Sequence, residues 1–261
     1  MKRYLRVWLR LAHISFSEQI TTRFSSILFL FSKTLRFVFF LLFIFSLTAR
    51  IGGLAGYNRD QIIIFFLVFN FVDIATQLFF RGVYFFRQKV VNGEFDFYLV
   101  KPMSPLFRIM AGYTDFMDLI TLFALIIYGV KFIAVSGIVL VPTTVFLALL
   151  TIIFSFLISF SIHVWVVAIG ILTTEVDNAI MVYRDLTSMA RFPVDVYSAP
   201  VRIFLTYIIP VAFIMTVPAQ ALLGLLSPLS IFISLLIVFC SLFSAFRLWR
   251  YALSQYSSAS S

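Results

Sequence analysis

The sequence predicts an all-α integral membrane protein with six transmembrane helices. Of its residues 62% are hydrophobic and only 12% are charged, and apolar runs long enough to cross a bilayer recur along the chain. Soluble domains are about one quarter charged, whereas a membrane-spanning helix needs about 20 apolar residues. The net charge of +9 comes from cations that flank the apolar runs, which favours contact with lipid headgroups and predicts no nucleic-acid partner.

Residues 1–22 mix cations with large apolar residues, a pattern typical of an amphipathic helix in the headgroup plane. The apolar run behind them starts near Phe24, too far along the chain for a cleaved signal peptide. We therefore expect a cytoplasmic N-terminus.

A single transmembrane domain is predicted over residues 23–250. Its six spans are expected at about 26–48, 61–80, 109–130, 143–168, 173–195 and 229–248. The first span contains Lys33 and Arg36, which implies either snorkelling to the interface or a span that begins near Leu35. The Ser-rich residues 251–261 are expected to form a disordered cytoplasmic tail.

The fifth span is polar, with six charged residues between positions 173 and 195. Helical spacing nevertheless places one set of apolar residues on a single face, namely Val176, Ile180, Tyr183, Leu186 and Ala190. We expect this helix to face partner helices instead of lipid.

Residues 196–226 are apolar but contain Pro200, Pro210 and Pro218. Each proline removes a backbone donor and kinks a helix, so one straight span does not suit this segment. Irregular backbone at membrane depth survives only where protein or a cavity surrounds it. The segment is predicted to form a proline-broken, partly re-entrant hairpin on the outer side.

The distribution of cations predicts the orientation. With both termini inside, 14 of the 20 Lys and Arg residues lie in inner segments, five lie in outer segments, and Arg184 lies within the fifth span. This bias predicts a multi-pass protein of the plasma (inner) membrane whose charged loop, residues 81–108, is cytoplasmic.

Residue types needed for catalysis are scarce. The chain has no GxxxxGK[ST] phosphate-binding loop, its single cysteine is Cys240, and its two histidines are His13 and His163. We expect no metal site, no cofactor on this chain and no catalytic residues.

Acidic residues within the spans are the main candidates for a translocation path. Asp73, Asp115 and Asp118 are costly in lipid and should face water or protein. They form either a path or proton relay, or structural contacts such as a pair between Asp73 and Arg81. The same two interpretations apply to charged residues of the fifth span, namely Glu175, Asp177, Arg184 and Asp185.

The charged loop contains a turn signal at Asn92–Gly93, followed by a short helix that Pro102 would end. Phe95, Tyr98 and Leu99 are expected on one face of this helix. That face either rests on the inner leaflet or docks into a cytoplasmic partner.

The loop sequence GEFDFYLVKPMSPLFR resembles the cytoplasmic loop of type-2 ATP-binding-cassette (ABC) exporter permeases, in particular a small six-span bacterial subgroup with a G-x-x-D-x-x-L-x-K/R-P pattern. Here that pattern is formed by Gly93, Asp96, Leu99, Lys101 and Pro102. Two further segments are similar to the subgroup, namely IGGLAGYNRDQIIIFF and RFPVDVYSAPVRIFLTYIIPVAFIMTVPAQALLG. Arg191 departs from the small residues usual before the Phe-Pro of the second segment.

The resemblance implies a second permease, identical or homologous, and two separate ATPase subunits that carry ATP and Mg. It implies a coupling helix in the charged loop, whose expected ATPase-coupling residues are Gly93, Glu94, Phe95, Asp96, Tyr98, Leu99, Lys101 and Pro102. The N-terminal helix corresponds to the family's interfacial elbow helix, and the hairpin to its outer re-entrant segment.

The predicted function is ATP-driven export of an amphipathic, drug-like or lipid-like molecule along a path lined by spans one, two and five. One alternative is an ion- or proton-coupled secondary transporter that uses Asp73, Asp115 or Asp118. Another is a membrane-embedded lipid-modifying enzyme, which the lack of a catalytic cluster disfavours.

Overall fold

The computed structural model describes residues 2–173 and 176–257. Its elements, in chain order, begin with α1 (Lys2–Thr21), α2 (Arg23–Ile51), β1 (Gly53–Leu54), β2 (Tyr57–Asn58), α3 (Arg59–Phe80), η1 (Arg81–Phe85), α4 (Phe86–Val91), α5 (Asp96–Leu99) and α6 (Pro105–Met110). The second half contains α7 (Phe116–Ser136), α8 (Pro142–Thr173), α9 (Val176–Met189), η2 (Val194–Val196), α10 (Ala199–Ile203), η3 (Phe204–Ile208), η4 (Ala212–Thr216), α11 (Val217–Leu222) and α12 (Pro228–Gln255).

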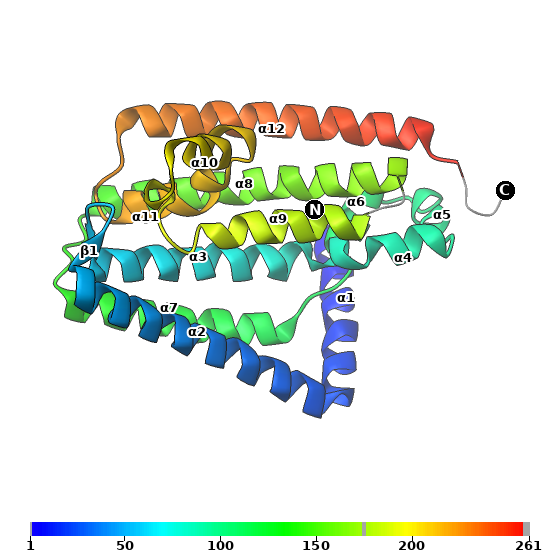
Figure 1. Cartoon of the computed structure of the whole chain (residues 1–261). Coiled ribbons are helices and arrows are strands. Elements are labelled where there is room, and N and C mark those ends of the chain that lie inside the picture. Colours follow the sequence, from blue (N-terminus) through cyan, green and yellow to red (C-terminus); the bar gives the residue numbers. More distant parts are fainter. Residues whose placement is uncertain (1, 174–175, 258–261) are drawn as a thin grey trace.

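The long helices lie side by side in one bundle, with the charged loop at one end and the β1–β2 turn at the other (Figure 1). We call these the loop end and the hairpin end. Five of the described helices are long and apolar enough to cross a membrane, namely α2, α3 with its continuation to Val91, α7, α8 and α12. A sixth span is obtained only if the bent pair Ala199–Ile208 and Ala212–Leu222 counts as one. The protein is an all-α, multi-pass membrane protein.

The helix in the predicted fifth span is shorter than expected. Within the predicted range of 173–195, α9 has 14 residues and is not among the helices long enough to cross a membrane. It ends before the hairpin end, where α10 and α11 occupy the remaining depth (Figure 1).

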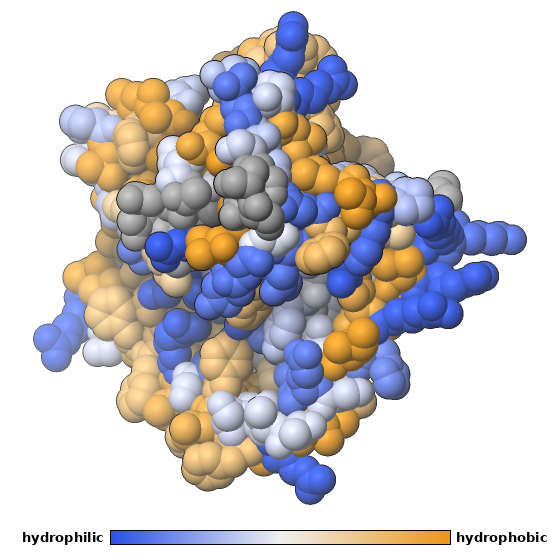
Figure 2. Space-filling view, turned by 90° about the vertical axis from the view of Figure 1, so that its right-hand side faces the viewer, coloured by the Kyte–Doolittle hydropathy of each residue, from blue (hydrophilic) through white to orange (hydrophobic). Residues whose placement is uncertain are grey.

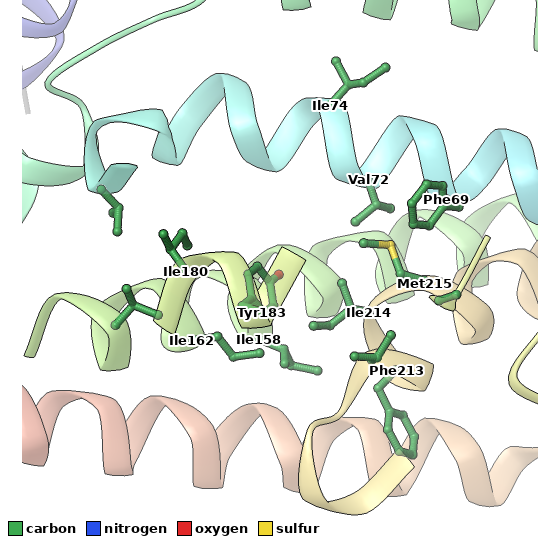
Figure 3. Close-up of a cluster of buried hydrophobic side chains, with 14 of the residues drawn as sticks. Phe69, Val72, Ile74, Ile158, Ile162, Ile180, Tyr183, Phe213, Ile214 and Met215 are labelled. Carbon is green, nitrogen blue, oxygen red and sulfur yellow. The ribbon is translucent and has the colours of Figure 1, made fainter. Parts of the chain in front are cut away.

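The predicted apolar face of α9 packs into the core. Figure 3 shows Ile180 and Tyr183 beside Ile158 and Ile162 of α8. Ile180, Tyr183 and Ala190 are buried and Leu186 packs against the same core, which confirms the helical spacing. The side chain of Val176 lies outside the described residues.

The proline hairpin, residues 196–226, breaks at one proline only. Its two halves meet at 80° around Pro210, which cannot donate the hydrogen bond that a continuous helix requires. Pro200 instead lies in the first turn of α10, where the N–H group that proline lacks has no helical partner. Pro218 lies within the helical segment Ala212–Leu222, directly after the π-helical turn η4, and does not interrupt it. The expectation that all three prolines break the helix is therefore wrong for these two.

Helix α1 lies crosswise to the bundle at the loop end (Figure 1). Polar contacts attach it to the start of the third span. Gln19 Nε2 donates to Tyr113 Oη at 3.1 Å, and Gln19 Oε1 accepts from the Phe116 backbone N–H at 3.0 Å. Leu5, Leu9 and Ile14 remain exposed on its apolar side.

Two predicted boundaries require correction. The third span begins at Phe116 instead of residue 109, because the Asp115 carboxylate caps α7 by accepting the Met117 N–H at 2.9 Å. At the other end of the chain α12 continues to Gln255. Part of the tail that was expected to be disordered is therefore helical.

Candidate functional site

A cavity of about 390 Å³ lies among α2, α3, α7 and α9. Helices of spans one, two and five contribute to its lining, and α7 contributes as well. Aromatic side chains line much of it, namely Phe29, Phe37, Phe40, Phe66, Phe69 and Tyr128. The remaining walls contain an unusual concentration of charge for a membrane interior.

An ion cluster closes the part of the cavity nearest the loop end. Asp118, which is fully buried, accepts from Lys33 and from Arg81 Nη1, the latter at 3.1 Å. Arg81 Nη2 lies 3.3 Å from Asp115 Oδ2. Two cations and two acids thus compensate each other. Lys33 reaches α7 instead of snorkelling, and the expected partner of Arg81, Asp73, is replaced by the two acids at the start of α7.

Asp73 is connected to this cluster through one amide. Gln77 Nε2 donates to Asp73 Oδ2 at 2.9 Å, while Gln77 Oε1 accepts from Arg81 Nη1 at 3.1 Å. Asp73 and Gln77 both line the cavity, and Asp73 is the only acid among the described residues that line it. Asp115 and Asp118 therefore share Arg81, and Asp73 is linked to the same guanidinium only through Gln77.

Three further arginines line the cavity without a carboxylate partner. Arg184 stacks on the ring of Tyr84 at 5.6 Å, and Arg191 lies over Phe40 at 5.7 Å and over Phe69 at 5.9 Å. Arg36 lies close enough to Arg191 to act on it electrostatically. Within residues 2–173 and 176–257, no ion pair involves Arg36, Arg184 or Arg191.

Of these three arginines, only Arg184 is a candidate for the translocation path on sequence grounds. A signal for Arg36 was present, because Lys33, Arg36 and Phe40 are three and four residues apart and share one helical face. Arg191 follows α9 and also lines the cavity. Asp185 is exposed on α9, and Glu175 lies outside the described residues.

The charged loop is folded tightly against itself. Gly82 packs on α6 so closely that a Cβ atom there would lie 2.0 Å from the Ile109 carbonyl oxygen. Gly93 adopts a φ of 72°, a left-handed conformation that glycine tolerates best, and so ends α4 at the predicted Asn92–Gly93 turn. The short helix α5 follows.

The residues that are buried and exposed on α5 differ from those predicted. Phe95 is 0% exposed and packs edge-on against Phe86 and Tyr256, and Tyr98 is 7% exposed beneath the guanidinium of Arg108. Both side chains are buried within this chain, so the exposed face of α5 is formed by other residues than expected. The exposed apolar side chains are Phe97 (65% exposed), Leu99 and Val100 (79% exposed).

Polar residues of the loop motif have distinct positions. Asp96 Oδ1 accepts from Tyr256 Oη at 2.8 Å, which attaches the C-terminal end of α12 to the loop. Lys89 donates to Glu94 Oε2 at 2.9 Å, and this hydrogen bond lowers the pKa of Glu94 below its ordinary value. Lys101 and Pro102 are exposed. Figure 2 views this end of the molecule, where hydrophilic side chains project between apolar patches.

At the opposite end, hydrogen bonds connect the β1–β2 turn to η2 and to the proline hairpin. Tyr57 Oη donates to Asp195 Oδ2 at 2.9 Å, and Gln220 Nε2 donates to Tyr57 Oη at 3.0 Å. These three side chains join β2, η2 and α11.

The family model described as "ABC-2 family transporter protein" matches residues 19–260, nearly the whole chain. The chain belongs to the ABC-2 transporter family. It is a permease, the membrane-spanning subunit of an ABC transporter. Neither a curated protein nor a solved structure matches it.

Proposed function

We propose that this permease exports an amphipathic, drug-like or lipid-like molecule, with energy from ATP that a separate ATPase subunit hydrolyses. The observation that carries the proposal is the exposed apolar side of α5 on a permease that lacks a phosphate-binding loop of its own. ATP and Mg would be bound by the partner. In this arrangement both termini and the charged loop lie in the cytoplasm.

The ATPase would contact Phe97, Leu99 and Val100, together with the exposed Glu94, Lys101 and Pro102. Exposed apolar side chains of this size on one short segment mark a contact surface. Phe95 and Asp96 would transmit movement instead of making the contact, because both meet Tyr256 at the end of α12. Gly93 and Tyr98 would shape and support the segment.

The cavity among α2, α3, α7 and α9 is the proposed path. Its aromatic walls suit an apolar substrate, and the Tyr57–Asp195–Gln220 contact would open at the exit. Two permeases, identical or homologous, and two ATPase subunits would form the complete exporter in the inner membrane.

Capture of the ATPase tests this proposal. The tagged chain is extracted from its own cells in a mild detergent, and copurified proteins are identified by mass spectrometry. We expect a P-loop ATPase that is lost when Phe97, Leu99 and Val100 are all replaced by Ser. Absence of any such ATPase from the unaltered chain would contradict the proposal.

A matched control is available at the hairpin end. Val139 is 81% exposed, as Val100 is at the loop end, but it lies in the turn between α7 and α8. Val139→Ser should leave the captured ATPase unchanged. Both variants should elute from a sizing column like the unaltered chain, which excludes unfolding as the reason for a loss.

The secondary-transport alternative has less support. Asp115 and Asp118 are held in ion pairs with Arg81 and Lys33, so both carboxylates are already occupied by cations of this chain. Asp73 alone remains available to the cavity.

A further inference from the structure

Charge is unevenly compensated around the cavity. Five cations line it, namely Lys33, Arg36, Arg81, Arg184 and Arg191. Asp115 and Asp118 compensate Lys33 and Arg81. Asp73 is the one acid left among the described lining residues, and its carboxylate is bonded to an amide. Three arginines, Arg36, Arg184 and Arg191, therefore share the cavity with a single remaining carboxylate, that of Asp73.

Such an excess is unfavourable within a bilayer. A charge without a partner loses its hydration and gains nothing in return, so charged side chains at membrane depth are paired or meet a ligand. Stacking of Arg184 and Arg191 on aromatic rings is worth only about 1 kcal/mol each. This stacking also leaves the N–H donors at the edge of each guanidinium free to bind an anion in the ring plane.

We propose that the cavity binds the anionic headgroup of an amphiphile, a carboxylate, sulfate or phosphate, through Arg36, Arg184 and Arg191. This inference rests on the proposed function, because it names the class of molecule carried. Guanidinium groups bind these oxyanions with two parallel hydrogen bonds, which an ammonium group cannot do.

The remaining walls suit the apolar part of such a molecule. Phe37, Phe66 and Tyr128 line the cavity beside the arginines. The volume of about 390 Å³ lies within the range of ligand pockets, roughly 300–1,000 Å³. Neutral or cationic amphiphiles would fill the same space but would leave the arginines uncompensated.

Binding of a fluorescent amphiphile to the full chain in phosphatidylcholine nanodiscs tests this inference without the ATPase. The probes are dansyl-labelled undecanoic acid, its methyl ester and the corresponding amine. We expect the acid to bind at least about tenfold more tightly than the ester, and the amine to bind most weakly.

Substitution of the three arginines by Gln should remove the preference for the acid, while affinity for the ester stays the same. Substitution by Lys should restore part of the preference, because charge returns without the paired donors. Arg59→Gln is the control, since Arg59 is exposed at the hairpin end and pairs with Asp60 at 3.3 Å. It should leave the preference unchanged.

Equal binding of acid and ester, or a preference that survives the three Gln substitutions, would overturn the inference. Preference for the amine would overturn it as well. These results are independent of ATPase capture. A permease that captures an ATPase but ignores the probe's charge refutes only the anion site, whereas failure of capture refutes the ATP-driven mechanism.

Discussion

The cations of the cavity form two groups that differ in their partners. Near the loop end Lys33 and Arg81 meet Asp118 and Asp115 across three helices. Deeper in the bundle Arg184 and Arg191 stack on aromatic rings, and Arg36 lies close enough to Arg191 to act on it electrostatically. Within the described residues none of the three forms an ion pair, and the charge of Asp73 reaches Arg191 only through space. The first group connects α2, α3 and α7, whereas the second group faces the cavity.

This difference separates two uses of charge in a membrane. A compensated cluster fixes the relative positions of helices, and removal of one partner leaves a buried charge behind. Uncompensated arginines contribute little to the fold. Their guanidinium N–H groups gain hydrogen-bond acceptors only when an anion binds.

The largest effect is expected for Asp118→Asn. Asp118 is fully buried and accepts from both cations of the first group. Its neutralisation leaves Lys33 without a carboxylate and should lower the free energy of unfolding by about 3 kcal/mol. Thermal unfolding in detergent measures this loss. Asp60→Asn, which breaks an exposed pair, should lower stability by less than about 1 kcal/mol.

A carboxylate introduced into the cavity should give the second group of cations a permanent partner, as the first group already has. Asn70 lines the cavity on α3, and Asn70→Asp changes its charge without changing its size. We expect affinity for an anionic amphiphile to fall about fivefold, or about 1 kcal/mol, because the arginines gain a resident anion. Titration with the dansyl-labelled acid and ester measures this change. Unaltered affinity for the acid would mean that the three arginines do not bind it.

The opposite change neutralises Asp73, the one acid among the described residues that line the cavity. Asp73→Asn keeps an oxygen that can accept from Gln77 but removes the negative charge. Affinity for the anionic probe should rise about threefold, which is about 0.7 kcal/mol, and ATP-driven transport should continue. In a proton-coupled carrier the same substitution would abolish transport, so a transport assay in proteoliposomes separates the two mechanisms.

The smallest effect is expected for the exposed pair of Lys89 and Glu94 in the charged loop. The pKa of Glu94 is lowered from 4.5 by its hydrogen bond to Lys89, so the pair stabilises the fold above pH 4.5 and is lost as the pH falls below that value. Because Glu94 is exposed, Glu94→Gln should change stability at pH 7 by less than about 0.5 kcal/mol. A larger loss in thermal unfolding would show that surface and buried pairs are equivalent here.

Much of the fold could be predicted from the sequence. Apolar runs of bilayer length locate the spans, and a spacing of three and four residues identifies the buried face of α9. These signals are local, because lipid and helix periodicity act on each segment separately. The charged loop was identified on the same basis.

Features that depend on contacts between helices could not be predicted. Arg81 lies 34 residues from Asp115 and 37 residues from Asp118 along the chain, and only the packing of α3 on α7 shows that these acids are its partners. A helix of four residues has no reliable period, so Phe95 and Tyr98 were expected on the surface where Phe97 and Val100 lie. The cavity position of Arg191 follows from the short length of α9.

Thermal unfolding of the variant with Arg36, Arg184 and Arg191 all replaced by Gln, with and without the dansyl-labelled acid, compares the two groups of cations in one experiment. We predict that without ligand its stability lies within about 1 kcal/mol of the unaltered chain, because no carboxylate is abandoned. Saturating acid should stabilise the unaltered chain, by about 2.7 kcal/mol at one hundred times the dissociation constant, and should not stabilise the variant. A loss as large as that of Asp118→Asn, or equal stabilisation of both chains by the acid, would contradict the assignment of these arginines to an anion site.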